Sequence, residues 1–189
     1  MAQLSARPDL LQDHLAGALA GDREAVSRLL TAIRPSIVRY CRARVGRSAA
    51  TADDVAQEVC LAVLTALPSY RDQGRPFLAF VYGIAAHKVA DAHRSVARNR
   101  SEPVAEVPDQ MSFDGGPEEH VLQGELSGEM GRLLRLLPEK QREILVLRVV
   151  VGLSAEETAE AVGSTPGAVR VAQHRALGRL RKAISDASG

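Results

Sequence analysis

The stretch that most constrains the fold is residues 153–182, where two short amphipathic segments flank a tight turn. Ser154 can cap a first helix, and Glu157 follows it in capping-box register. Gly163 supplies the left-handed residue that ends this helix. Thr165 can then cap a second helix, with a proline at its first position, where a missing N–H is harmless. Two helices joined by a tight glycine turn predict a helix-turn-helix.

The second of these helices has two different faces at about 100° per residue. The side predicted to face the core carries Val169, Ala172, Ala176 and Leu180. The opposite side presents Arg170, Val171, His174 and Arg175, with Ala172 close by. Arginines can chelate guanine and a valine can touch a thymine methyl group, and no acid occurs between residues 163 and 185. The pattern favours DNA reading, against the alternative of an ordinary helix with a solvated basic face.

The composition favours helices over sheets. Hydrophobic residues make up 46% of the 189 residues, but aromatic residues are only 3% and tryptophan is absent. The net charge of +1 conceals an uneven distribution, because residues 101–131 contain eight acids and no Lys or Arg. An acidic stretch therefore separates two basic flanks.

Cysteine usage and hydropathy point to a soluble protein. Cys41 and Cys60 are isolated within apolar helical patterns, which favours reduced, buried thiols over a disulfide or a metal site. No signal peptide is recognised and no apolar run approaches 18 residues. These features predict a cytoplasmic protein without a membrane span.

Hydrophobic periodicity predicts an all-α fold. Helices are expected over about residues 10–21, 22–46 with an interruption at Pro35, 51–67 and 76–100. The pattern resumes near Val121, and Pro138 opens a further helix with Ile144, Leu145, Leu147 and Val149 directed inward. The acidic, Pro- and Gly-containing residues 101–121 predict a flexible linker. The expected architecture is two small helical domains, residues 10–100 and 122–186, joined by this linker.

The helix predicted over residues 51–67 has a second, polar face. Its core side carries Val55, Val59, Ala62 and Val63, whereas Asp54, Gln57, Glu58 and Leu61 recur at i, i+3, i+4 and i+7 on a different side. From the residues alone, this second face is most simply a solvated polar surface.

Three segments in order carry a family resemblance: DDVAQEV, then RPFLAFVYGIAAHKVADAHR, then LPEKQREILVLRVVVGLSAEETAEAVGSTPGAVRVAQHRALGRLRK. Together they resemble the extracytoplasmic-function sigma factors, the smallest class of the bacterial sigma-70 family. The similarity is greatest to the actinobacterial, SigD-like members, and it extends from about Leu15 to Ile184.

The resemblance implies roles for matching positions in the first domain. Asp54, Gln57, Glu58 and Leu61 would bind the clamp helices of the RNA polymerase beta-prime subunit. The minus-10 promoter element would be recognised and opened by Phe80, His87, Lys88, Asp91 and Arg94. Melting requires a pocket for a flipped base and a basic surface for the single strand. Phe80 stands where the family usually has tryptophan, and packing in the core remains an alternative for it. A metal site at His87, Asp91 and His93 is disfavoured, because the two histidines point to different sides of the helix.

In the second domain the resemblance implies that Arg170, Val171, Ala172, His174 and Arg175 read the minus-35 element. Its first helix would touch the polymerase beta flap, although Leu133, Leu134 and Leu137 are equally well explained as core. The acidic linker would either mimic nucleic acid in the polymerase channels or act as a plain spacer. An anti-sigma factor between the two domains is a possible further partner.

The implied function is a sigma subunit that binds core polymerase and directs promoter-specific initiation, without being an enzyme and without a cofactor. A stand-alone helix-turn-helix regulator is the alternative from another class. An enzyme is disfavoured, because no nucleophile–base pair, phosphate loop or metal-ligand spacing is present.

Overall fold

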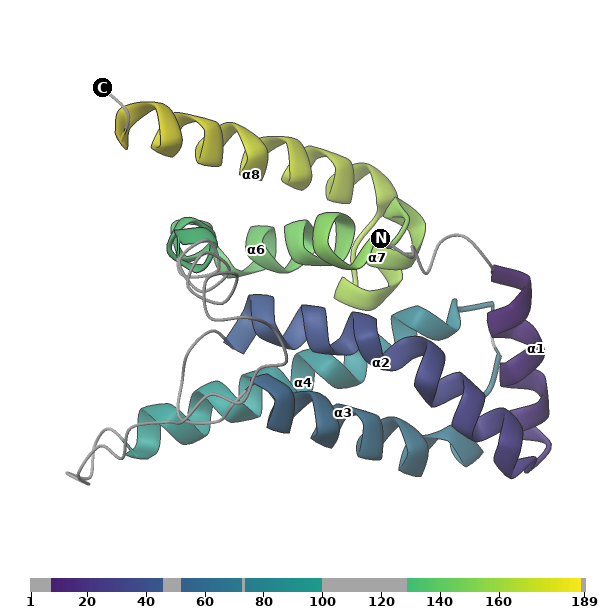
Figure 1. Cartoon of the computed structure of the whole chain (residues 1–189). Helices are drawn as coiled ribbons and strands as arrows, with labels where there is room; N and C mark the ends of the chain where they lie inside the picture. The colour runs from purple at the N-terminus through teal and green to yellow at the C-terminus, as the bar shows by residue number, and fades with distance from the viewer. Residues whose placement is uncertain (1–7, 46–51, 73, 100–128, 188–189) are drawn as a thin grey trace, which may run out of the picture.

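The computed structural model describes residues 8–45, 52–72, 74–99 and 129–187, and these residues contain helices but no strand (Figure 1). The elements are α1 (Pro8–Leu19), α2 (Arg23–Val45), α3 (Ala52–Ala66), the 3-10 turn η2 (Leu67–Ser69), α4 (Phe77–Asn99), α6 (Glu139–Leu145), the π-helical η3 (Val146–Val151), α7 (Ala155–Val162) and α8 (Pro166–Ala187). Residues 129–135 form one further helical segment. The predicted all-α fold class is confirmed, whereas the predicted linker, residues 101–121, lies outside the described residues.

The interruption predicted at Pro35 is wrong, because α2 continues through it. Proline lacks the N–H that would bond the Thr31 carbonyl. Thr31 and Pro35 are both exposed, so water can reach that carbonyl, while Ile33 and Ile37 on the other side are fully buried. Packing on the buried side therefore maintains the helix across the proline.

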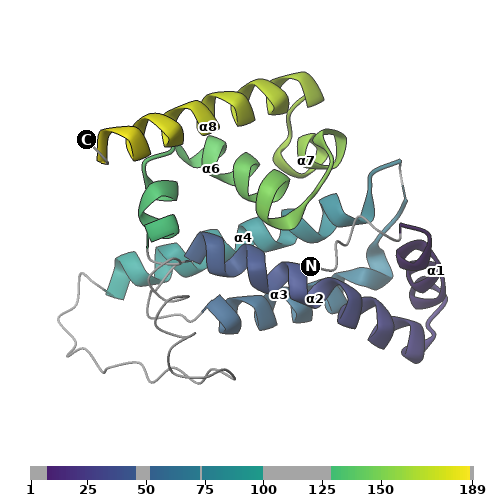
Figure 2. The ribbon, with the colours of Figure 1, turned by 45° about the horizontal axis from the view of Figure 1, so that its top comes forward.

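The N-terminal half, residues 8–99, is built around α2, which packs against α1, α3 and α4 (Figure 2). Its buried residues recur at helical spacing, as in Leu29, Ile33, Ile37 and Cys41 on α2, Val55, Val59 and Val63 on α3, and Val81, Ala85 and Val89 on α4. Fully burying one such aliphatic side chain contributes about 1.5–3 kcal/mol. This interior fixes α3 and α4 against each other and leaves their outer faces in solvent.

The C-terminal half, residues 129–187, has a small core of its own beneath the helix-turn-helix, formed by Ile144, Ala155, Ala159 and Val169. The prediction that Val149 points inward is wrong, because its side chain is exposed. It lies in η3, where the Gly152 N–H donates to the Leu147 carbonyl at 3.0 Å, an i→i+5 bond. Val149 follows the buried Leu147 by two residues and so lies on roughly the opposite side of the helix, whereas Val151 follows Leu147 by about one turn and is buried.

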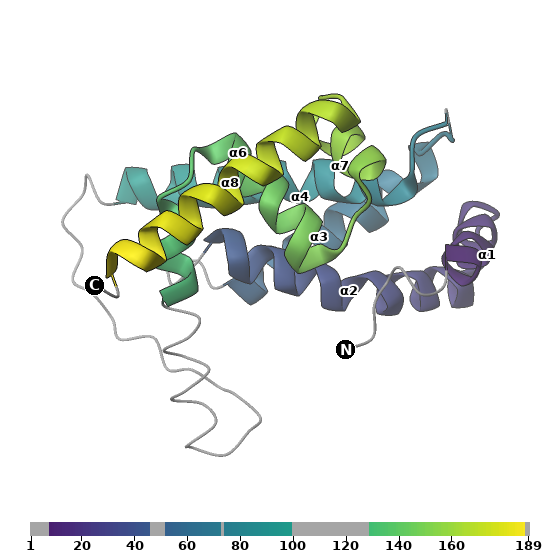
Figure 3. The same ribbon diagram turned by 90° about the horizontal axis from the view of Figure 1, so that it is seen from above.

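The two halves pack against each other and share one continuous hydrophobic core. A single cluster of buried residues extends from α2, α3 and α4 to η3 and α8, and α2 contacts η3 while α4 contacts α7. The view from above shows the C-terminal half lying over α2 and α4 (Figure 3). Within the described ranges, no helix combines the length and the apolarity that crossing a membrane requires.

Candidate functional site

The helix-turn-helix is built by the local interactions that its sequence predicts. Ser154 Oγ accepts a hydrogen bond from the Glu157 N–H at 3.0 Å, and the Glu157 carboxylate accepts one from the Ser154 N–H at 2.7 Å. Gly163 ends α7 with φ at 60°, and Thr165 Oγ1 accepts from the Ala168 N–H at 3.2 Å. A cap of this kind contributes about 1 kcal/mol, so the two helices are held in place on both sides of the turn.

The start of α8 brings together the residues predicted to read DNA. Arg170, Val171, His174 and Arg175 are all exposed on one side of the helix. Val169 and Ala176 on the opposite side are fully buried, and Ala172 is partly buried against the small core. Ala172 therefore borders the exposed face, which offers two guanidinium groups, an imidazole and an apolar side chain to a ligand.

Two side chains outside α8, Glu156 and Arg148, hold residues near the start of α8. Glu156 Oε1 accepts a hydrogen bond from Arg170 Nη2 at 2.7 Å. Arg148 Nε donates to Gln173 Oε1 at 3.0 Å, and the same guanidinium donates to the Leu153 carbonyl. The pKa of Glu156 is lowered by the hydrogen bond from its own backbone N–H and by the adjacent guanidinium. No sequence signal pairs Glu156 with Arg170 or Arg148 with Gln173, since each of these side-chain bonds joins separate helices.

The second candidate surface lies on α3 and comprises Asp54, Gln57, Glu58 and Leu61, here termed the α3 face. All four are exposed, and 56% of Leu61 is accessible to solvent. Leu64, one turn further along, is also exposed. The α3 face thus presents carboxylates, an amide and an apolar side chain to solvent.

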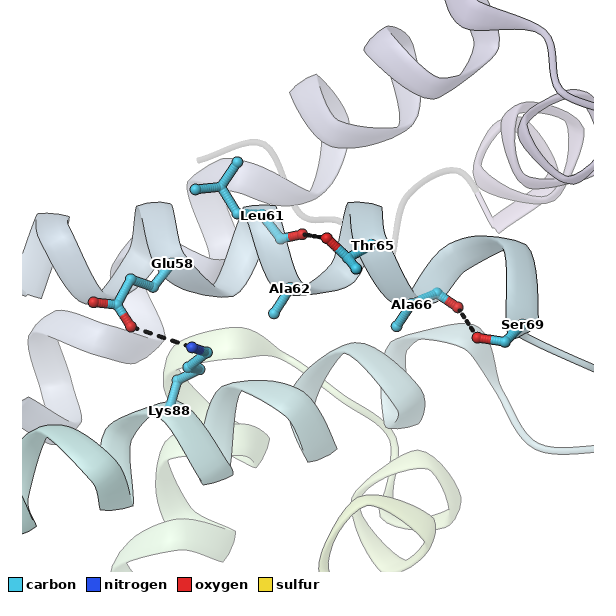
Figure 4. Close-up of a pocket in the computed structure, with 7 residues that line it drawn as sticks. All are labelled: Glu58, Leu61, Ala62, Thr65, Ala66, Ser69 and Lys88. Atoms are coloured by element: carbon cyan, nitrogen blue, oxygen red, sulfur yellow. Dashed lines mark hydrogen bonds and ion pairs between the residues drawn. The ribbon is translucent and has the colours of Figure 1, made fainter.

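The α3 face adjoins α4 across an open groove lined by Glu58, Leu61, Ala62, Thr65, Ala66, Ser69 and Lys88 (Figure 4). Glu58 Oε2 and Lys88 Nζ face each other across this groove at 3.3 Å. The predicted docking residues and the predicted minus-10 residues therefore meet at one ion pair.

On α4, the exposed residues His87, Asp91 and Arg94 follow one another at helical spacing, and Asp91 is paired with Arg94. Phe80, one of the predicted minus-10 residues, is partly buried. Its ring lies 5.0 Å from the Tyr70 ring and 6.0 Å from the Phe77 ring, measured between centroids. The structure thus places Phe80 in an aromatic cluster at the start of α4, apart from the exposed polar residues.

The metal alternative gains no support from the positions of the histidines. His93 Nε2 lies 3.1 Å from the Arg44 carbonyl oxygen, a contact to α2 rather than toward His87. Among the described residues, no group of three or more His, Cys, Asp or Glu side chains is arranged to hold a metal ion. Burial raises the pKa of the Cys41 thiol to about 12, and it also raises that of the half-buried Cys60.

Packing of the two halves buries charged residues between α2 and α6. The Arg44 side chain is only 6% exposed, and its Nε lies 2.6 Å from Glu143 Oε2, which is 13% exposed. Tyr40 donates a hydrogen bond to the other Glu143 oxygen at 2.6 Å. Burial, followed by the Glu143 charge, raises the pKa of Tyr40 well above its ordinary value. At the other end of the interface Arg75 pairs with Glu160 at 3.5 Å.

Comparison with known proteins gives consistent matches over both halves. Residues 29–99 match the family model for sigma-70 region 2, and residues 127–180 match that for sigma-70 region 4. The ECF RNA polymerase sigma factor SigD of Mycobacterium tuberculosis (strain H37Rv) is 65% identical over 173 residues, which is 90% of this chain and 82% of that protein. The ECF RNA polymerase sigma factor ShbA of Streptomyces griseus is 52% identical over 171 residues, 87% of this chain and 90% of that protein.

A solved structure of CnrH in complex with the cytosolic domain of CnrY superposes with a TM-score of 0.71 at 25% identity, covering 96% of this chain and 100% of that one. Region 2 carries the α3 face and α4, and region 4 carries the helix-turn-helix, so the two matched regions contain all of the candidate surfaces. The chain belongs to the extracytoplasmic-function sigma factors of the sigma-70 family, and it directs promoter-specific transcription initiation by RNA polymerase rather than acting as a stand-alone regulator.

Proposed function

We propose that this sigma factor docks on core RNA polymerase through the α3 face and contacts promoter DNA through α4 and α8. The observation that carries the docking proposal is the exposure of Leu61, which is 56% accessible on the same face of α3 as Asp54, Gln57 and Glu58. A helix that served only the fold would more often place this leucine on its buried side, beside Val59 and Val63. The clamp helices of the polymerase beta-prime subunit are the partner that the family resemblance implies for this face.

Minus-10 recognition is assigned to the exposed side of α4, which carries His87, Lys88, Asp91 and Arg94. Lys88 and Arg94 supply positive charge for a single strand, and His87 can donate to or accept from a flipped base. Phe80 contributes through the aromatic cluster with Tyr70 and Phe77, which supports the start of α4. A partly exposed ring there is also available for stacking on a base.

Minus-35 recognition is assigned to Arg170, Val171, Ala172, His174 and Arg175 on α8. Arg170 and Arg175 can each pair with the O6 and N7 atoms of guanine, and Val171 can contact a thymine methyl group. Of the three leucines considered for the beta flap, Leu134 and Leu137 are buried and Leu133 is partly buried, whereas Leu136 and Met130 are exposed and could supply apolar contacts.

The remaining expectations concern activity, location and regulation. Sigma factors are initiation factors, and we assign this chain no catalytic residue, no cofactor and a cytoplasmic location. CnrH was solved in complex with the cytosolic domain of CnrY. Because this chain packs its two halves in a similar arrangement, a protein partner such as an anti-sigma factor fits it as well.

The docking proposal is tested by the double variant Asp54→Ala/Glu58→Ala together with the single variant Leu61→Ala. Both are expected to weaken the complex with core polymerase by about tenfold or more, which is about 1.4 kcal/mol, because they remove charge and apolar contact from one face. Binding is measured by fluorescence anisotropy of the labelled chain titrated with purified core polymerase. Helical circular dichroism should stay unchanged, since all three side chains are exposed.

The matched control is Asp53→Ala, an acid on the same helix that pairs with Arg42 of α2 at 3.1 Å. It removes one negative charge close to the α3 face without changing the face itself. Wild-type affinity in the double variant and in Leu61→Ala would move the docking surface elsewhere. An equal loss in Asp53→Ala would show a general charge effect instead.

A further inference from the structure

Arg170, at the start of the recognition helix, is already paired before any DNA is bound. Its Nη2 donates to Glu156 Oε1 at 2.7 Å. Glu156 lies in the first turn of α7, 14 residues earlier in the chain, so this bond spans the helix-turn-helix. Both side chains are exposed. The pair is therefore a feature of the DNA-facing surface rather than of the core.

Glu156 provides a fixed and charged anchor. Its backbone is held by the capping box between Ser154 and Glu157, which defines the first turn of α7. The amino end of a helix favours a carboxylate, and the pKa of Glu156 is lowered by the hydrogen bond from its own backbone N–H and by Arg170. Arg170 is thus paired with a charged group whose backbone position is fixed by the cap of α7.

An exposed ion pair adds little to stability, so the consequence of this one lies in recognition. A guanidinium has five N–H donors, and the bond to Glu156 leaves others free to pair with the edge of guanine. Contacts between arginine and phosphate carry no sequence information. The neighbouring negative charge on Glu156 reduces the attraction of Arg170 to phosphates, which favours the base contact over the phosphate contact.

We propose that Glu156 is a specificity-determining positioning residue, which holds the Arg170 guanidinium in place to read a base of the minus-35 element. The proposal rests on the proposed role of Arg170 in minus-35 recognition. Glu156 itself acts through Arg170 and makes no contact with DNA.

The chain offers a matched control on the same helix. Glu160 is a second α7 carboxylate, and it pairs with Arg75 of the N-terminal half at 3.5 Å instead of with α8. Glu156→Ala and Glu160→Ala each remove one negative charge from α7. A general electrostatic effect would appear in both variants, whereas a positioning effect would appear only in the first.

The experiment uses holoenzyme assembled from core polymerase and the full chain, transcribing a pool of barcoded promoters in which the minus-35 segment is randomised. Wild-type protein gives the base preference at each position, and Arg170→Ala identifies the position at which that preference is lost. At this position Glu156→Ala is expected to lower base discrimination about three- to tenfold, the range associated with ordering one long side chain. Glu160→Ala should match wild type, and Arg170→Ala/Glu156→Ala should match Arg170→Ala. Circular dichroism of each variant checks that α7 remains folded.

The outcomes distinguish the positioning role of Glu156 from the role of Arg170 in minus-35 recognition. If Arg170→Ala keeps every base preference, Arg170 does not read DNA and its proposed function fails, together with the role of Glu156. If Arg170→Ala loses a preference that Glu156→Ala retains, only the positioning role is overturned. Equal losses in Glu156→Ala and Glu160→Ala would overturn it in favour of general charge. A Glu156→Ala effect that persists without Arg170 would overturn it in favour of direct contact between Glu156 and DNA.

Discussion

The Arg44–Glu143 ion pair is expected to decide how tightly the two halves of the free chain stay packed. In the proposed function, α4 and α8 contact promoter elements at minus 10 and minus 35, which are about 25 base pairs apart, or roughly 85 Å at 3.4 Å per base pair. A compact chain of this length has a radius of gyration of about 16 Å. On the proposed function, the packed arrangement cannot reach both elements at once, so we expect initiation to require the halves to separate.

Glu143→Ala is the perturbation that favours this separation. It leaves the Arg44 guanidinium, 6% exposed, without its nearest carboxylate and removes the acceptor of the Tyr40 hydroxyl. Breaking a buried ion pair by removing one partner destabilises the state that buries it by about 3–5 kcal/mol. Because Arg44 regains water when the halves part, this free energy shifts the packing equilibrium rather than unfolding the helices. The population of the open form relative to the packed form should rise by a factor of about one hundred to several thousand.

The assay is small-angle X-ray scattering of the free chain, with helical circular dichroism measured on the same samples. Glu143→Ala should increase the radius of gyration while the helical signal is retained. Glu139→Ala is the control, because Glu139 also approaches Arg44, at 3.6 Å, but is 79% exposed and contributes at most about 1 kcal/mol. An unchanged radius of gyration in Glu143→Ala would refute the reasoning and leave apolar contacts as what holds the halves together.

Two further predictions concern the cysteines. Iodoacetamide at pH 8 should modify Cys60 well before Cys41, because Cys41 is fully buried with its pKa raised to about 12 whereas Cys60 is half-buried. Peptide mass spectrometry measures the order of modification. Equal rates at the two cysteines would contradict the packing of α2 on α3. The same raised pKa predicts a loss of stability at alkaline pH. The unfolded chain releases the Cys41 proton near pH 9 and the folded chain does so only near pH 12, so the free energy of unfolding should fall over this interval. In Cys41→Ala, the free energy of unfolding measured with urea should fall less steeply with rising pH than in wild type. An identical slope would show that Tyr40 and Tyr82, whose pKa values are also raised by burial, account for the fall.

The helix-turn-helix could be predicted from sequence because its determinants are local. The capping box at Ser154 and Glu157, the left-handed Gly163 and the cap at Thr165 each act within a few residues and agree with one another. The exposed side of α8 followed from helical periodicity alone. Local signals were sufficient here because these bonds join residues that are close in sequence. They can form however the two halves of the chain are arranged.

Two local rules failed where tertiary contacts or an unusual turn intervened. Pro35 was expected to break its helix, but the buried isoleucines on either side of it along α2 stabilise the helical path more than one missing hydrogen bond destabilises it. Val149 was expected to point inward, but it follows the buried Leu147 by two residues, within the π turn η3, and so lies on roughly the opposite side. The course of α2 through Pro35 leaves no signature in a single sequence.

The packing of the two halves was beyond prediction for a different reason. Tyr40 and Glu143 are separated by 103 residues, and nothing in either segment identifies the other as its partner. Arg44 does have one distinguishing feature, since it is a charged residue on the buried stripe of α2 that contains Ile37 and Cys41. A charge in that position implies a buried partner without naming it.

The same interface involves the helices that are proposed to contact DNA. The Arg44 carbonyl accepts a hydrogen bond from His93 of α4, while the Arg44 side chain pairs with Glu143 of α6, so one residue links α4 to region 4. At the other end, Arg75, just before α4, pairs with Glu160 of α7. The Arg44–Glu143 and Arg75–Glu160 pairs thus join the two halves, whereas the bond between His93 and Arg44 lies within the N-terminal half. Separation of the halves must break both ion pairs and the packing of α4 on α7, and on the proposed function this separation is what lets α4 and α8 reach their separate promoter elements.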